Sequence, residues 1–234
     1  MAGGKLTPRQ KMINLMYLVF IAMLAMNMSK EVLSAFGLMN EKFEASNLTA
    51  SKSNEQSLAA LDLKAKESKG EFIKAAATAN KVSDASKKFY SFIESLKEEN
   101  LKGTEPEEGK LPYEAMDKAD NLDHSWFTGD GYTKRGTVVM SAIETYKSEM
   151  KSALNDPKYS VILKQVNDAF NTGDVKNKEG VSIKFLDYHF KGFPQIASLA
   201  KLSAWQSDIK KIETDVINSA LGKAAVDEEA TDKE

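Results

Sequence analysis

LAALDLKAKESKGEFIKAAATANKVSDASKKFYSFIESL, residues 58–96, carries the pattern that decides the fold. A seven-residue repeat of apolar or small side chains, a/d in type, is typical of packed helices. Because several members of the repeat are small, it predicts helices that approach one another closely. Two sets form the repeat, three positions apart: Leu58, Ala65, Phe72, Ala79, Ser86 and Ile93, with Leu61, Ser68, Ala75, Val82, Phe89 and Leu96.

The chain around this repeat extends the helical pattern. A polar stretch rich in Ser and Asn, residues 46–56, precedes it, and a loop with two glycines and two prolines follows it. Residues 181–185 alternate apolar and polar, which predicts a short extended segment or hairpin. Asp156 and Pro157 are placed as the N-cap and first residue of a helix. Further helices are expected over residues 113–122, 135–154, 157–170 and 194–221.

We therefore expect an all-α protein. Residues 37–221 would form an up-and-down helical bundle of four or more helices. In the connection between helices, Trp126 and Phe127 are expected to fill one end of the core. The acidic tail, residues 222–234, is expected to be disordered.

An uncharged run from Met12 to Met28 lies near the start of the chain. It is close to the ~20 residues needed to span a bilayer, so we expect a transmembrane helix with an extension, residues 12–36. Two alternatives are a buried core helix and a cleaved signal peptide. A soluble helix would keep a wider polar stripe. A signal peptide would have a shorter apolar run, and the one suitable small-x-small triplet, residues 35–37, is poorly placed.

Charges on the two sides of this run predict its orientation. Lys5, Arg9 and Lys11 precede it without an acidic residue, whereas the charges after it are mixed. The positive-inside rule then places residues 1–11 in the cytoplasm and the bundle outside the inner membrane, in the periplasm of a Gram-negative cell.

Polar residues of the run gather on one side if the helix is continuous. At about 100° per residue, Arg9, Asn27, Glu31 and Tyr17 fall within an arc of roughly 80°, and Asn14 lies about 60° beyond Tyr17. Polar groups facing lipid are costly, so these residues are candidates for contact with a partner inside the membrane. The alternative is that Arg9 and Glu31 only extend to opposite interfaces.

No carboxylate lies between Met12 and Met28. A membrane helix that carries protons usually has one in its apolar zone. If the protein takes part in proton-driven work, the titrating carboxylate must therefore come from a partner.

Composition and motifs give no sign of catalysis, metal or cofactor. The chain has no cysteine, and its net charge of -2 does not favour nucleic acid. His124 and His189 belong to no metal-ligand pair at helical spacing. Glu98–Glu99 and Glu107–Glu108, beside Lys97, Lys102 and Lys110, are interpreted as solvated faces. We expect a protein that is not an enzyme and binds no cofactor.

The N-terminus, GGKLTPRQKMINLMYLV at 3–19 with AMLAMNMSKEVL at 22–33, resembles the GldM/PorM family of inner-membrane components of Bacteroidota type IX secretion and gliding motility. The resemblance is strongest over residues 3–40. The last helix, with its segments 199–202 and 209–216, is similar in character to the end of the family's first periplasmic domain. The family continues into further β-rich periplasmic domains, whereas this chain stops after the helical one.

The resemblance implies a function and partners. Family members form homodimers whose transmembrane helices sit inside a ring, expected to be pentameric, of a two-span partner, GldL/PorL, which supplies the membrane carboxylate. Arg9 matches the basic residue expected to pair with that carboxylate. The implied function is a motor subunit that couples the proton-motive force to mechanical work. It would contact the partner, itself and lipid, and no nucleic acid.

Two other function classes are compatible with a single N-terminal apolar segment followed by a helical domain. A membrane-anchored periplasmic adaptor or sensor is the alternative, but the ~11 residues before the span leave no room for a cytoplasmic signalling domain. A secreted helical binding protein would require cleavage of the N-terminal segment.

Overall fold

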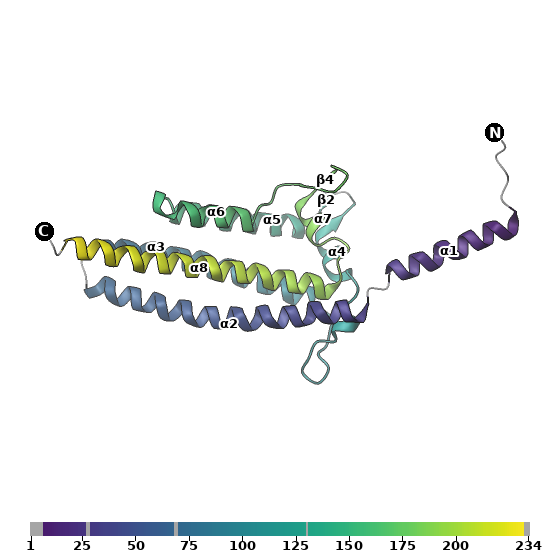
Figure 1. The fold of residues 1–234 in the computed structure, drawn as a ribbon, viewed down its shortest axis with the longest axis horizontal. Helices are drawn as coiled ribbons and strands as arrows, with labels where there is room; N and C mark the ends of the chain where they lie inside the picture. Colours follow the sequence, from purple (N-terminus) through teal and green to yellow (C-terminus); the bar gives the residue numbers. More distant parts are fainter. Residues whose placement is uncertain (1–6, 27–28, 68–69, 130, 232–234) are drawn as a thin grey trace.

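Three long helices lie side by side and make the body of the protein (Figure 1). They are α2 (Lys30–Glu67), α3 (Glu71–Asn100) and α8 (Gln195–Thr231). α8 packs along both of the others, which run antiparallel to each other. The computed structural model describes residues 7–26, 29–67, 70–129 and 131–231.

The seven-residue repeat is buried as predicted, but it does not lie on one helix. Its members on α2, such as Leu61, and on α3, such as Val82 and Ile93, belong to one core. The chain changes direction near Gly70, which has a φ of 96°. Glycine adopts this conformation without the steric penalty that other residues meet. The repeat therefore continues in phase through a break between two helices.

α2 begins far upstream of the repeat. Ser29 starts it, because the Val32 N–H lies 3.1 Å from the Ser29 carbonyl and 3.3 Å from its hydroxyl. The polar stretch 46–56 lies inside this helix. Buried residues recur every seven positions from its first turns to its last: Leu33, Asn40, Asn47, Asn54 and Leu61.

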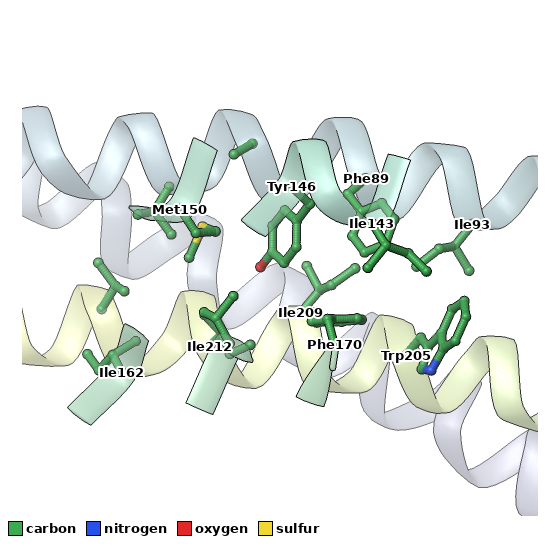
Figure 2. Packing of buried hydrophobic residues seen from close by; sticks show 14 of the residues in the cluster. Phe89, Ile93, Ile143, Tyr146, Met150, Ile162, Phe170, Trp205, Ile209 and Ile212 are labelled. Carbon is green, nitrogen blue, oxygen red and sulfur yellow. The ribbon is translucent and has the colours of Figure 1, made fainter. Parts of the chain in front are cut away.

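A second layer, α5 (Lys134–Ala153) and α6 (Ser160–Ala169), covers α3 and α8. Aromatic rings fill the space between the layers (Figure 2). Phe89 stacks on Tyr146 at 4.8 Å between ring centroids. Phe170 meets both rings edge-on and continues to Trp205 at 6.3 Å. These contacts join α3, α5, the end of α6 and α8 into one core.

Short elements connect the helices. η1 (Tyr113–Ala115) and α4 (Asp120–Trp126) replace the single helix expected over residues 113–122. Trp126 and Phe127 are buried, as predicted. β1 (Phe127–Thr128) pairs with β2 (Gly131–Tyr132). The hairpin expected near residues 181–185 is confirmed by β4 (Ser182–Ile183), which pairs with β3 (Val175–Lys176). η2 (Pro157–Tyr159) and α7 (Phe185–His189) complete the chain.

The predicted cap at Asp156 is present. Its carboxylate accepts a 2.9 Å hydrogen bond from the Lys158 N–H, and Pro157 is the first residue of η2.

The long helices agree with their predicted bounds in one case and exceed them in another. α5 covers almost the whole of the helix expected over residues 135–154. α8 extends to Thr231, through residues where we expected a disordered tail. The protein is mainly helical, in agreement with the predicted all-α class.

α1 (Pro8–Met26) lies outside the bundle, beyond the start of α2 (Figure 1). Between Pro8 and Thr231, no helix that the structure describes combines the length and the apolar character needed to cross a bilayer.

Candidate functional site

The predicted partner-binding residues do not all lie on one helix. Arg9, Asn14 and Tyr17 lie on α1 and are exposed to solvent. Glu31 is an exposed residue in the first turn of α2. Asn27 lies outside the described residues. Because α2 starts afresh at Ser29, the angular arithmetic that grouped Glu31 with Arg9 does not carry across from α1.

α1 presents large apolar side chains to solvent. Each of five is more than half exposed, and they surround Tyr17, which is 67% exposed. Contiguous exposed apolar surface of this kind marks contact with a membrane or another protein. The five are Met12, Ile13, Leu15, Met16 and Leu18.

The bundle has an unexpected interior: a polar seam where α2, α3 and α8 meet. We use this name for a set of contacting polar side chains, most of them buried, that replaces apolar packing along the three helices. The members are Asn40, Glu44, Asn47 and Asn54 of α2, Ser83, Glu94 and Lys97 of α3, and Ser203, Gln206, Lys210 and Glu213 of α8.

One end of the polar seam is organised by Lys97, which is only 4% exposed. Its ammonium contacts the Glu44 carboxylate, lies 3.2 Å from Glu94 Oε2 and donates to Gln206 Oε1 at 3.1 Å. A buried charge is tolerated only when it is paired and hydrogen-bonded. Burial, followed by the nearby carboxylates of Glu44 and Glu94, raises the pKa of Tyr90 to about 12.

The other end is organised by Glu213. Its carboxylate lies 3.0 Å from the Lys210 ammonium. It also accepts hydrogen bonds from Ser83 Oγ at 2.7 Å and from Asn54 Nδ2 at 3.3 Å. The Lys210 ammonium stands 5.0 Å from the centre of the Tyr90 ring. All three long helices thus contribute to the environment of one buried ion pair.

Two asparagines repeat the same contact seven residues apart. Asn47 Nδ2 donates to the Ser203 carbonyl at 3.0 Å, and Asn54 Nδ2 donates to the Lys210 carbonyl at 3.1 Å. Thr214 Oγ1 donates to Asn54 Oδ1 at 2.7 Å. Buried asparagines at such positions favour one helix register, because sliding leaves their amides unpaired. The two contacts therefore favour one register between α2 and α8.

Sequence reasoning missed the polar seam. Lys97 was expected on a solvated face but is buried, and Glu99 is paired with Arg135 at 2.9 Å. The available signal was the spacing of Asn40, Asn47 and Asn54, which keeps the seven-residue phase of Leu33 and Leu61. Residues 46–56 were described only as a polar stretch that precedes the helical repeat.

His189 borders a polar pocket of 430 Å³ between α6, β3, α7 and α8. The Lys201 ammonium contacts His189 Nδ1. Burial, followed by that cation, lowers the pKa of His189 to about 4. His124, in contrast, is exposed, with Nδ1 at 2.7 Å from the Asp120 carbonyl. Within the described part of the chain, no three His, Cys, Asp or Glu side chains are grouped to hold a metal ion.

Comparison with known families identifies a relationship. The family described as the GldM N-terminal domain matches residues 31–223, which is most of the chain. These residues include α2 from its second residue onward and the complete polar seam. No curated protein matches the chain.

Proposed function

This chain belongs to the family of the GldM N-terminal domain, and from that premise we propose that it is an inner-membrane motor subunit. Family membership ties the chain to the gliding motility and type IX secretion machinery. We propose that, with a GldL/PorL-like partner, it couples the proton-motive force to the mechanical work of secretion and gliding.

The observation that carries this proposal is the surface of α1. Apolar side chains such as Met12 and Leu15 are exposed on it, in the same helix as Arg9. In a membrane these side chains would meet lipid or partner helices. The sequence provides no carboxylate from Met12 to Met28, so a titrating carboxylate would come from a partner. Lys5, Arg9 and Lys11 precede this run, and Arg9 is the one that the family resemblance matches to the basic residue expected to pair with that carboxylate.

We propose that the membrane segment covers residues 12–28, with residues 1–11 in the cytoplasm and the bundle in the periplasm. The polar seam supports a mechanical role for the bundle, because its hydrogen bonds between helices, such as those of Asn47 and Asn54 to α8, fix the register of the helices that they join. In this proposal the protein acts as a homodimer inside a ring of partner subunits, and it transmits motion without catalysis or cofactor.

Arg9 provides the main test. We expect Arg9→Ala to abolish secretion and gliding at an unchanged protein level, and Arg9→Lys to retain part of both, because the charge is kept. Lys11→Ala is the matched control, since Lys11 lies about 200° around the same helix from Arg9. Normal secretion and gliding in the Arg9→Ala strain would contradict the motor proposal.

The topology has its own test. The chain has no cysteine, so single cysteines introduced at Thr7 and Ser46 are unique labels. In intact cells whose outer membrane is made permeable, a maleimide that cannot cross the inner membrane should label Ser46→Cys and leave Thr7→Cys unlabelled. Labelling of both positions, or of neither, would refute the proposed orientation.

A further inference from the structure

The end of the bundle nearest α1 has a core of its own. Leu33 of α2 and Met116 are each 1% exposed and pack with Ile196 and Leu199 of α8. This cluster is separate from the main core. We call residues 111–118 the collar, because this segment lies against the start of α2, at the end of the bundle nearest α1 (Figure 1).

Tyr113 fixes the collar to α2. Its ring lies directly over Gly37, where an added Cβ would stand 2.2 Å from the ring atom Cδ2. No residue other than glycine leaves space for this contact. The phenol oxygen of Tyr113 donates to Glu41 Oε1 at 2.6 Å. Burial, followed by the Glu41 carboxylate, raises the pKa of Tyr113 to about 12, so the phenol stays protonated as a donor.

The collar also holds the start of α8, and the start of α8 in turn holds the end of α3. Backbone N–H groups of Gln195 and Ile196, at the start of α8, donate to the carbonyls of Lys118 at 2.8 Å and Met116 at 3.2 Å. Asn100, at the end of α3, exchanges two hydrogen bonds with Gln195, of 3.0 and 2.6 Å. The start of α2 is thereby joined to the ends of both neighbours.

The position of this joint gives it meaning. Two residues separate α1 from Ser29, so any displacement of α1 reaches the bundle through the first turns of α2. Helix ends fray and are the least stable parts of a fold unless tertiary contacts hold them. A frayed end would absorb the displacement, whereas an end held by the collar would pass it to all three helices.

We propose that the collar is the joint through which movement of α1 drives the bundle, with Tyr113 as its positioning residue. This inference rests on the motor function proposed above. The ion pair between Lys30 and Glu114, at 3.3 Å, ties the collar to the first turn of α2 and gives a place to lock the joint.

The first measurement is hydrogen exchange on the purified full chain in detergent. We expect Tyr113→Ala to speed amide exchange in residues 30–44 by about tenfold or more, because the held end would open locally. Exchange in α5 should be unchanged. Tyr113→Phe, which keeps the ring and loses only the hydrogen bond, should stay close to the unmodified chain. Tyr188→Ala removes an exposed tyrosine elsewhere and is the control.

The second measurement is secretion and gliding in the native bacterium. We expect Tyr113→Ala to reduce both severalfold at normal protein level and normal co-purification with the partner, and Tyr113→Phe to support both. A short bismaleimide bridge between cysteines at Lys30 and Glu114 should restore both activities in the Tyr113→Ala background. A tyrosine needed only for stability would not be rescued at normal protein level in this way.

Three outcomes would overturn the proposal: unchanged exchange in Tyr113→Ala, faster exchange with full secretion and gliding, or failure of the bridge to restore activity. Arg9→Ala, made as a single variant in the same parent strain and measured in the same assays, distinguishes failure of the collar proposal from failure of the motor proposal. If Arg9→Ala is impaired and Tyr113→Ala is not, the collar proposal alone is wrong. If Arg9→Ala leaves secretion and gliding normal, the motor proposal itself is wrong.

Discussion

The Lys210 ammonium and the Glu213 carboxylate lie 3.0 Å apart within the helix core, where the two residues are only 7% and 2% exposed. Removing one charge leaves the other buried without its counter-ion, which costs far more than an exposed pair is worth. The pair therefore links the chemistry of the polar seam directly to the stability of the bundle.

Glu213→Leu should lower the free energy of unfolding by about 3–5 kcal/mol, because Lys210 is left uncompensated. The double variant Lys210→Met/Glu213→Leu should recover most of this loss. Asp215→Ala is the control, since Asp215 and Lys211 form a surface pair at 2.7 Å, and such pairs contribute about 0–1 kcal/mol. Urea unfolding followed by circular dichroism measures all three. Equal losses for Glu213→Leu and Asp215→Ala would show that the Lys210–Glu213 pair contributes no more to the free energy of unfolding than a surface pair does.

The two seam asparagines should respond differently to replacement by leucine. Asn54 has partners for both amide atoms, so Asn54→Leu should cost about 1–3 kcal/mol by leaving Glu213 and Thr214 with fewer partners. Asn47 Oδ1 has no hydrogen-bond partner, so Asn47→Leu should be close to neutral. The same unfolding experiment compares them. A larger loss for Asn47→Leu than for Asn54→Leu would reverse this assignment.

Replacing glycine by alanine should have opposite effects on the stability of the fold at two positions, Gly136 and Gly222. A Cβ at Gly136 would lie 2.3 Å from the Trp126 carbonyl oxygen, so Gly136→Ala should cost about 1–3 kcal/mol through overpacking. Gly222, in α8, has nothing within 4 Å of the same atom, and Gly222→Ala should gain about 0.5–1 kcal/mol from helix propensity. Thermal melting of each variant gives the sign. A Gly136→Ala chain as stable as the parent would mean that the α4–α5 connection can move apart.

His189 should make stability depend on pH. Its pKa is lowered to about 4 in the folded chain, from 6.5. The unfolded chain therefore binds more protons between these values, so stability should rise with pH from about 4 to 6.5 and fall on acidification. The effect should be on the order of 1 kcal/mol, because the side chain is only half buried and solvent screens it.

His189→Gln gives the comparison that isolates this contribution, since carboxylates also titrate in acid. As the pH falls from 6.5 toward 4, the parent should lose free energy of unfolding relative to His189→Gln, because only the parent has this histidine to protonate. A difference that stays constant with pH would exclude His189 as the source of the slope.

Much of the helical architecture could be predicted from periodicity. The repeat from Leu58 to Leu96 identified the buried faces correctly, because burial depends on local spacing. It could not place the turn at Gly70, since the same phase continues on both sides of the break. The helix over residues 46–56, inside α2, was not predicted because Asn47 and Asn54 fill core positions with amides. Only contacts with α8, distant in sequence, make those positions stable.

Arg9 and Tyr17 could be selected from the sequence, because a charge and a phenol stand out in an apolar run, and their role in binding a partner stays a prediction. Lys97 and Lys210 could not be selected, since a lysine is usually exposed. Their burial depends on groups from other helices, such as Glu44 and Gln206 for Lys97 and the Tyr90 ring for Lys210. The collar depends on the contact between Gly37 and Tyr113. These two residues lie far apart in the sequence, so no local sequence pattern predicts that they meet.

The length of α2 gives the collar mechanical leverage. With 38 residues and a rise of about 1.5 Å each, the helix extends about 57 Å from its fixed end. A tilt of about 10° at the collar would sweep the Gly70 end through about 10 Å, provided that the bundle moves rigidly. A displacement at the collar that is smaller than the width of one helix would thus become a displacement about as wide as a helix at the Gly70 end of α2.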